Sequence, residues 1–166
     1  KKETKALRVE EAPLIDGKLD EEVWKNVPIA KDFVMFEPGD GDPEPDDQKT
    51  EFKIIYDNTS IYIGAYLYDL NPNNIMRQLS ERDNFGTADF FAVGFNPNND
   101  GQNVYAFFVT SAAIQLDAQI SPTNGIDYSW SEVWFSEVSF DEEGWYVEMK
   151  IPYSALRFAD VEEMIW

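Results

Sequence analysis

One loop combines charged groups, an amide and an aromatic ring within residues 82–89, just before an apolar run that predicts a buried strand. Its polar and aromatic members are Arg82, Asn84, Phe85 and Asp89. The apolar C–H face of a pyranose stacks on aromatic rings, while its hydroxyls pair with carboxylate, amide and guanidinium groups. These four residues are therefore candidate sugar contacts. The alternative is an Arg82–Asp89 ion pair that only holds the loop in place.

A second candidate segment contains two tryptophans. Trp130 and Trp134 are separated by an even number of residues, so a strand would direct both side chains to one face. We expect Trp134 to be buried and Trp130 to lie nearer the surface, where its ring could contact a sugar.

Side chains that carry oxygen alternate at Asn96, Asn98 and Asp100, and Gly101 follows them. This order resembles the first half of a calcium loop, but Phe107 stands where the bidentate Glu of such a loop is needed. A hairpin turn accounts for the segment more simply, because Asn, Asp and Gly tolerate positive φ. We expect the turn and keep calcium, held by these three residues, as the alternative.

The composition excludes several classes of function. The chain of 166 residues carries a formal charge of −19, which disfavours nucleic acids and anionic membrane surfaces as partners. It has no Cys and no His, which removes Ser-His-Asp and Cys-His catalysis and the common zinc sites. No apolar run approaches the ~20 residues that a membrane helix needs.

Two other functions, glycoside hydrolysis and haem binding, would use acids and methionines that the chain does contain. A glycosidase needs a pair of acids flanking a cleft, but spacing singles out no pair among the 32 acids, so we predict no enzyme activity. A haem-binding sandwich would have to ligate iron through Met35, Met76 or Met149 because His is absent. We expect Met149 to pack in the core instead.

The elements that must position these residues are strands. From Thr50 onward, runs of Tyr, Phe, Val and Ile are broken about every 8–12 residues by turn formers, which predicts an all-β sandwich or barrel. Asp57-Asn58-Thr59 should form a hairpin turn. The expected strands are Ala6–Val9, Ala30–Phe36, Glu51–Tyr56, Ser60–Tyr68, Ala88–Phe95, Tyr105–Thr110, Ile114–Ile120, Glu132–Phe140 and Trp145–Ile151.

The stretch Leu14–Trp24 predicts a short β segment, an Asp-Gly turn and a helical turn in succession. We expect Asp20 to cap that helical turn and Trp24 to point inward, closing one end of a core. Residues 37–47, rich in Pro, Gly and acids, predict an exposed loop. A helical turn should follow Ile151, and Met164–Trp166 resembles the opening of a further strand, so we expect residues 1–166 to be one domain within a longer protein.

Together, several stretches resemble the family 9 carbohydrate-binding modules, and more closely the family-9-like domain that begins a group of large bacterial envelope proteins, mostly from Bacteroidetes relatives. The stretches that carry the resemblance are Ile15–Trp24, Ile61–Asp69, Asp89–Phe91, Asn96–Gly101 and Gly144–Phe158.

The resemblance implies a jelly-roll-like antiparallel β-sandwich with short helical turns, exported to the periplasm, outer membrane or extracellular space. In true modules a sugar is clamped between two tryptophans near a structural calcium. Here Phe85 takes the first stacking position, Trp130 or a residue beyond Trp166 takes the second, and Ala92 stands where a polar partner is expected.

The predicted function is a non-catalytic carbohydrate-binding or accessory domain of an exported protein linked to polysaccharide catabolism. It would bind oligosaccharide or polysaccharide and be joined to a downstream region such as a hydrolase. The alternative is a structural or interaction domain of an outer-membrane protein that has lost sugar binding. A haem-binding sandwich is the third hypothesis.

Overall fold

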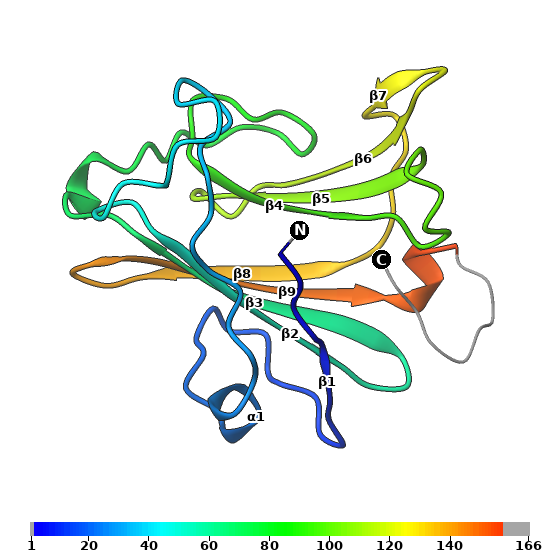
Figure 1. The fold of residues 1–166 in the computed structure, drawn as a ribbon, viewed down its shortest axis with the longest axis horizontal. Helices are drawn as coiled ribbons and strands as arrows, with labels where there is room; N and C mark the ends of the chain where they lie inside the picture. The colour runs from blue at the N-terminus through cyan, green and yellow to red at the C-terminus, as the bar shows by residue number, and fades with distance from the viewer. Residues whose placement is uncertain (1, 158–166) are drawn as a thin grey trace. The chain divides into compact units, whose positions relative to one another are not determined.

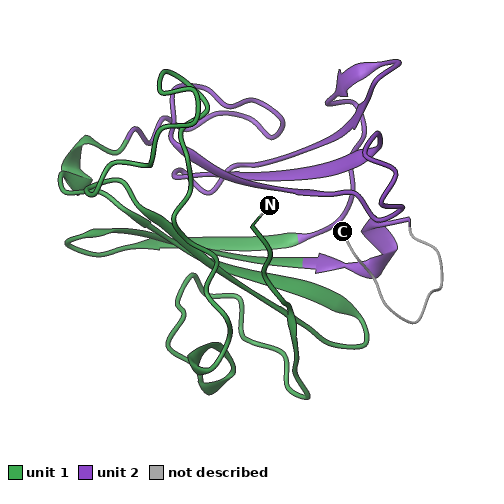
Figure 2. Cartoon of the chain, in the orientation of Figure 1, with its two compact units in different colours: residues 1–75, 135–150 green, residues 76–134, 151–166 purple. Residues whose placement is uncertain are grey.

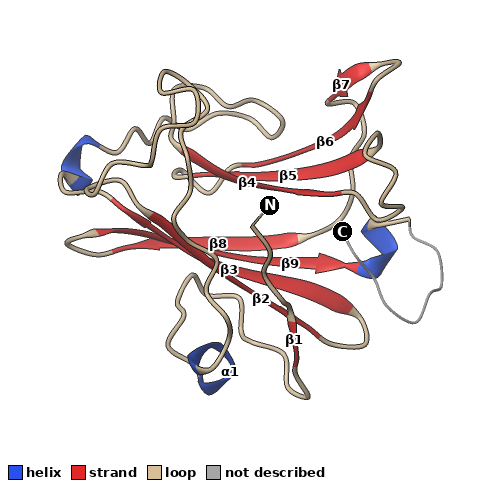
Figure 3. Cartoon of the chain, viewed as in Figure 1, coloured by secondary structure: helices blue, strands red, loops and turns tan. Residues whose placement is uncertain are grey.

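The structure is a computed structural model that describes residues 2–157. Strands dominate the regular structure, with one short α-helix and two 3-10 turns in this part of the chain (Figures 1 and 3). The backbone divides into two compact units, each built from two segments (Figure 2). Unit 1 comprises Lys1–Ile75 and Phe135–Lys150, and unit 2 comprises Met76–Trp134 and Ile151–Trp166.

The first sheet has five strands in the order β1-β2-β3-β9-β8. Their bounds are β1 Leu7–Arg8, β2 Thr50–Tyr56, β3 Ser60–Tyr68, β8 Phe135–Phe140 and β9 Gly144–Pro152. β1 lies parallel to β2, whereas the β2–β3 and β8–β9 pairs are antiparallel. The predicted hairpin after β2 is confirmed, because Asp57 Oδ1 accepts the backbone N–H groups of Thr59 and Ser60 at 2.6 and 2.9 Å.

Both faces of β3 are covered near its start, as its sequence predicts. Ile61 and Ile63 are buried on one face, and Tyr62 is buried on the other. Tyr62 packs with Trp24, which is fully buried at the single turn of α1 (Glu22–Lys25). The prediction that Trp24 closes a core is therefore confirmed.

The capping prediction for this turn is wrong. The cap position is held by Glu21, not Asp20, and no side chain caps the helix. α1 begins one residue later than predicted, and the Glu21 carboxylate reaches back to accept the N–H of Leu14 at 3.0 Å.

A buried carboxylate fastens this N-terminal segment to the sheet. Glu148 of β9 is fully buried, and its Oε2 accepts the N–H groups of Asp16 and Gly17, both at 2.9 Å. Its Oε1 accepts the indole N–H of Trp24 at 3.1 Å. Gly17 has φ of 79°, and a Cβ there would lie 2.8 Å from the Val138 carbonyl carbon, so the turn requires glycine. Two stretches distant in sequence thus meet at one carboxyl group.

Burial raises the pKa of Glu148 to about 7, because desolvation outweighs the hydrogen bonds from Asp16 and Gly17 and the charge of Glu21 adds to it. Glu21 Oε2 is itself buried and accepts no hydrogen bond from the described residues.

The raised pKa predicts that stability falls with rising pH. The native state retains a proton on Glu148 that the unfolded chain, with a pKa near 4.5, has released. This contribution to stability is fully present below about pH 4.5 and is lost as the pH rises through about 7. Urea unfolding at pH 5 and pH 8 should show a smaller difference in Glu148→Gln than in the native chain. Equal differences in the two proteins would contradict the prediction.

The second sheet has four antiparallel strands in the order β4-β5-β6-β7. Their bounds are β4 Phe90–Phe95, β5 Val104–Thr110, β6 Gln115–Ser121 and β7 Gly125–Asp127. The register places Phe108 opposite both Ala92 and Leu116, so these side chains share one face. The neighbouring residues Phe107 and Val109 are fully buried on the other face. β7 is a strand of three residues that the sequence did not indicate.

The strand predicted at Ala30–Phe36 is wrong. Only isolated bridges occur there, from Ala30 to Phe52 and from Val34 to Pro43. Phe33 stacks on Phe52 of β2 with ring centroids 5.7 Å apart, but Val34 and Phe36 of the same apolar run are exposed, Phe36 by 87%. The loop predicted over residues 37–47 is confirmed, because it contains no strand and most of it is exposed.

At the C-terminal side of β9, the predicted helical turn is present as a 3-10 turn at Tyr153–Ala155, whereas Met164–Trp166 lie outside the described residues. Another 3-10 turn occupies Pro72–Asn74. None of the helices within residues 2–157 is long and apolar enough to cross a bilayer.

Candidate functional site

Four aromatic rings gather on one face of the four-stranded sheet, and we call them the aromatic face: Phe85, Phe90, Phe108 and Tyr128. Phe85 packs against Phe90 and Phe108, with ring centroids 5.0 and 5.3 Å apart. Tyr128 lies beyond β7, with its centroid 6.2 Å from that of Phe85 and 6.4 Å from that of Phe108. Phe90 is 50% exposed and Tyr128 39%, so the cluster reaches the surface.

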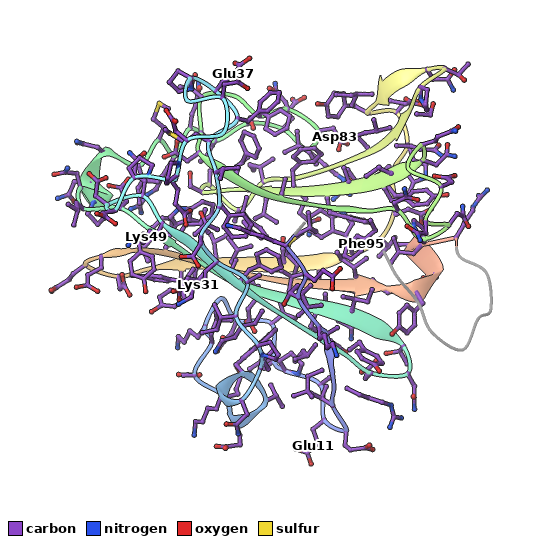
Figure 4. The ribbon with its side chains drawn as sticks, in the orientation of Figure 1. Glu11, Lys31, Glu37, Lys49, Asp83 and Phe95 are labelled. Carbon is purple, nitrogen blue, oxygen red and sulfur yellow. The ribbon has the colours of Figure 1, made fainter. Side chains whose placement is uncertain are left out.

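The loop before β4 holds Phe85 in place through its own polar groups. Asn84 Oδ1 accepts the N–H of Gly86 at 3.0 Å, and Gln78 Oε1 accepts the N–H of Thr87 at 2.7 Å. Asp83, which marks this loop in Figure 4, has φ of 63° and Gly86 has φ of 57°. Left-handed residues on both sides of Phe85 turn the chain so that its ring lies on the sheet.

Arg82 anchors the same loop to β6. Its Nη2 donates to Asp117 Oδ1 at 2.6 Å, and its Nη1 donates to Gln115 Oε1 at 2.6 Å. Asp117 is fully buried and also accepts the N–H of Glu132. The buried carboxylate needs the guanidinium charge. Arg82 therefore has a structural partner in the part of the chain described.

The alternative prediction of an Arg82–Asp89 ion pair is wrong. Arg82 does hold the loop in place, as that alternative implied, but its partner is Asp117. The Asp89 side chain instead accepts the N–H of Met76 at 3.2 Å. The Asp89 N–H donates to the Met76 carbonyl at 3.0 Å, so Asp89 joins the start of β4 to a neighbouring segment.

Trp130 lies apart from the aromatic face. Its ring packs on Tyr105 and Phe107, with centroids 5.1 and 5.9 Å away. Phe107 and Phe108 are adjacent on β5 and point to opposite faces, so the structure does not bring Trp130 to Phe85. Trp134 is buried and Trp130 half-buried, as predicted.

Three members of the aromatic face were missed by sequence reasoning. The paired phenylalanines at residues 90–91 and 107–108 indicate that both faces of these strands carry rings, and this signal points to Phe90 and Phe108. Tyr128 lies within the second candidate segment, residues 127–134, but only the short β6–β7 hairpin brings it to the sheet beside Phe85.

The segment around Asn96 forms the predicted turn. Asn96 Oδ1 accepts the N–H of Asp100 at 3.2 Å, and Asp100 Oδ1 accepts the N–H groups of Gln102 and Asn103 at 2.8 and 2.9 Å. The hydrogen bonds from Asn103 and Gln102 lower the pKa of Asp100 to about 2. Asn99 and Gly101 have positive φ, as the turn requires.

The described residues contain no group of three or more His, Cys, Asp or Glu that could hold a metal. The oxygens of Asn96 and Asp100 serve the turn in this conformation, and calcium bound by Asn96, Asn98 and Asp100 stays a prediction. Met149 is fully buried in β9, which confirms the expected core role.

An all-β chain with a partly exposed aromatic face beside a polar loop has the features of a ligand-binding β module. Comparison with known families identifies which one. Residues 15–165 match the family described as "Carbohydrate family 9 binding domain-like", and the chain belongs to this family. The match includes parts of both units. Domains of this family are non-catalytic carbohydrate-binding modules, in agreement with the prediction that the chain is not an enzyme.

Two solved structures resemble the chain. One is a family 9 carbohydrate-binding module from Caldicellulosiruptor kristjanssonii in complex with glucose, with a TM-score of 0.55, 16% identity, and coverage of 98% of this chain and 72% of that chain. The other, from the same organism in complex with cellotriose, has a TM-score of 0.54, 17% identity, and coverage of 89% and 67% respectively. The likeness confirms the predicted fold, a jelly-roll-like β-sandwich. No curated protein matches the chain.

Proposed function

We propose that this module binds neutral oligosaccharides or polysaccharides at the aromatic face, as an accessory domain of an exported protein linked to polysaccharide catabolism. The observation that carries the proposal is the cluster of four rings with Phe90 and Tyr128 open to solvent. The link to export and to a larger partner region rests on the resemblance to envelope proteins.

The chemistry of the face favours a neutral sugar. Apolar C–H groups of a pyranose gain contact area on Phe90, Phe85 and Tyr128. The exposed Asn84 lies next to Phe85 and offers an amide to sugar hydroxyls. A charge of −19 on the whole chain disfavours anionic polysaccharides. Glucose and cellotriose, which the similar modules bind, are therefore the first probes.

The earlier candidate residues receive different roles in this proposal. Phe85 and Asn84 contact the sugar, together with Phe90 and Tyr128. Arg82 positions the loop that carries Phe85, because its guanidinium is engaged by Asp117. Contacts from Trp130 and Asp89 stay predictions, and each of these residues has a structural neighbour of its own.

Replacing Phe90 by Ala, or Tyr128 by Ala, should weaken binding by about 1–2 kcal/mol, which is about tenfold in Kd or somewhat more. The reason is that each change removes an exposed ring from the stacking surface and leaves the buried face of the sheet intact. Calorimetric titration with glucose and cellotriose measures the effect. Phe36→Ala is the matched control, because Phe36 is an exposed ring (87%) that is not a member of the aromatic face, so its loss should not alter affinity.

The alternative of a structural or interaction domain is favoured by one observation, the small residue Ala92 on the exposed side of β4 next to the rings. Under that alternative, the native chain would bind none of a panel of soluble oligosaccharides. Affinity unchanged in both Phe90→Ala and Tyr128→Ala would also refute the proposed site.

A further inference from the structure

Unit 1 carries a second group of aromatic side chains, which we call the tyrosine patch: Tyr66, Tyr68, Tyr146 and the carboxylate of Asp141. Tyr66 and Tyr68 belong to β3, and their ring centroids lie 4.5 Å apart with planes at 90°. Tyr146 belongs to β9, and its centroid lies 4.4 Å from that of Tyr66. All three tyrosines are half-buried, so each retains some surface in contact with solvent.

Asp141 organises the patch from the turn between β8 and β9. The hydroxyl of Tyr66 donates to its Oδ1 at 2.8 Å, and the hydroxyl of Tyr146 donates to its Oδ2 at 3.0 Å. The N–H of Glu143 donates to Oδ1 at 2.9 Å. Burial disfavours the charge of Asp141, but these hydrogen bonds outweigh it and hold the pKa below its usual value.

The phenols of Tyr66 and Tyr146 are therefore fixed and uncharged. Burial, followed by the hydrogen bond to Asp141, raises the pKa of Tyr146 to about 12 and raises the pKa of Tyr66 as well. Because the hydroxyl protons of Tyr66 and Tyr146 are directed to Asp141, the lone pairs of these two phenol oxygens can only accept hydrogen bonds from another molecule.

The N-terminal segment covers only part of this side of β3. A Cβ on Gly64 would lie 2.5 Å from Leu19 and 3.1 Å from Trp24, so the N-terminal segment packs directly on β3 at Gly64. Tyr66 is two residues further along and points to the same side, yet it is partly exposed, unlike the fully buried Tyr62. Lys49, labelled in Figure 4, marks this end of the sheet, since its carbonyl accepts the N–H of Tyr68.

We propose that the tyrosine patch is a second carbohydrate-binding surface, separate from the aromatic face, and that it takes neutral glycans. Its ring surfaces stack on sugar C–H groups, and its phenol oxygens accept hydrogen bonds from sugar hydroxyls. Glu51, paired with Tyr66 in the register of the sheet, and Glu143 place negative charge around the patch, which disfavours anionic glycans.

Ring spacing argues against an ammonium ligand. An aromatic cage holds a cation between ring faces, but centroids 4.4–4.5 Å apart place these rings in direct contact with one another. A ligand must therefore lie over the rings, as a flat sugar does. Two surfaces on one chain would also raise the avidity for a polymer above the affinity for a short oligosaccharide.

The test is an NMR titration of the native chain, labelled at tyrosine and probed with cellotriose. Single Tyr→Phe variants assign the ring signals of the eight tyrosines. We expect the signals of Tyr68 and Tyr146 to shift with cellotriose, and to shift equally in Phe90→Ala, where the aromatic face is damaged. The variants of the patch serve only for assignment, and the titration compares the native chain with Phe90→Ala, both of which keep the patch intact, so misfolding of a patch variant cannot imitate the result.

The outcomes separate the two proposed sites. Shifts at Tyr128 without shifts at Tyr66, Tyr68 and Tyr146 would overturn the second surface and leave the first. Shifts at the patch alone would support the second surface and overturn the first. Absence of any shift at millimolar cellotriose would overturn both for this class of sugar.

A binding experiment with a polymer gives an independent measure. In affinity electrophoresis with soluble hydroxyethylcellulose, Tyr68→Ala should bind about tenfold more weakly than the native chain. Tyr68 is chosen because it contributes a ring without being one of the two hydroxyl donors to Asp141. Leu70→Ala, at a largely exposed residue nearby, is the control that should behave as the native chain. Equal retardation of both variants and the native chain would contradict the inference.

Discussion

Glu148→Ala should lower the free energy of unfolding by about 3–5 kcal/mol. The change leaves three buried donors without an acceptor, namely the N–H groups of Asp16 and Gly17 and the indole N–H of Trp24. It also leaves a cavity beneath the segment that covers the first sheet. Urea unfolding followed by tryptophan fluorescence measures the loss.

Glu137→Ala is the matched control for this prediction. Glu137 lies directly opposite Glu148 in the β8–β9 register but is exposed, so its removal should change stability by less than about 0.5 kcal/mol. Glu148→Gln retains one carbonyl oxygen for the two backbone donors. Its loss of unfolding free energy should therefore lie between those of Glu137→Ala and Glu148→Ala. A loss below about 1 kcal/mol in Glu148→Ala would show that the carboxyl group does not hold the N-terminal segment.

Arg82→Met should lower the free energy of unfolding by about 2–4 kcal/mol, because it leaves Asp117 buried with no positive partner. We expect a smaller loss of stability than for a fully buried ion pair, because the Arg82 side chain is 40% exposed and water screens its charge. Thermal or urea unfolding gives the magnitude. The double variant Arg82→Met/Asp117→Asn should recover part of the loss, because it removes the uncompensated charge.

Arg8→Met is the control for a surface arginine, since Arg8 pairs with Glu10 at an exposed site and should contribute little. The Arg82 prediction also affects how binding data are interpreted. A weaker sugar affinity in Arg82→Met follows from a displaced loop whether or not the guanidinium touches the ligand. If the double variant recovers stability but not affinity, direct contact by Arg82 is supported.

Most of the strands could be predicted from the sequence, because alternation of apolar and polar residues is a local property. Ser60–Tyr68 is found with the predicted bounds, and the β2–β3 hairpin turns at Asp57-Asn58-Thr59. The failure at Ala30–Phe36 has the same origin. Its apolar run Phe33–Phe36 suits a strand locally, but the segment makes only two isolated bridges, one of them to Phe52 of β2, and Val34 and Phe36 stay exposed.

The candidate site could be predicted only in part. The loop containing Phe85 was found because its side chains are close in sequence and chemically suited to sugars. Its partners Phe90, Phe108 and Tyr128 come from β4, β5 and the residue after β7, and only strand pairing brings them together. Trp130 is the opposite case, because it was a sequence candidate that the fold separates from Phe85. It packs on Phe107, whose side chain points to the other face of β5 from Phe108.

The sequence by itself determined the all-β fold, the turns, the burial of Trp24 and Trp134, and the absence of histidine and cysteine chemistry. These depend on residue type and short-range spacing. Only the tertiary structure decided which carboxylates are structural, because Glu148 and Asp117 are defined by donors and charges far away in the chain. It also decided which rings share a surface, since strand register and chain reversals set those neighbours.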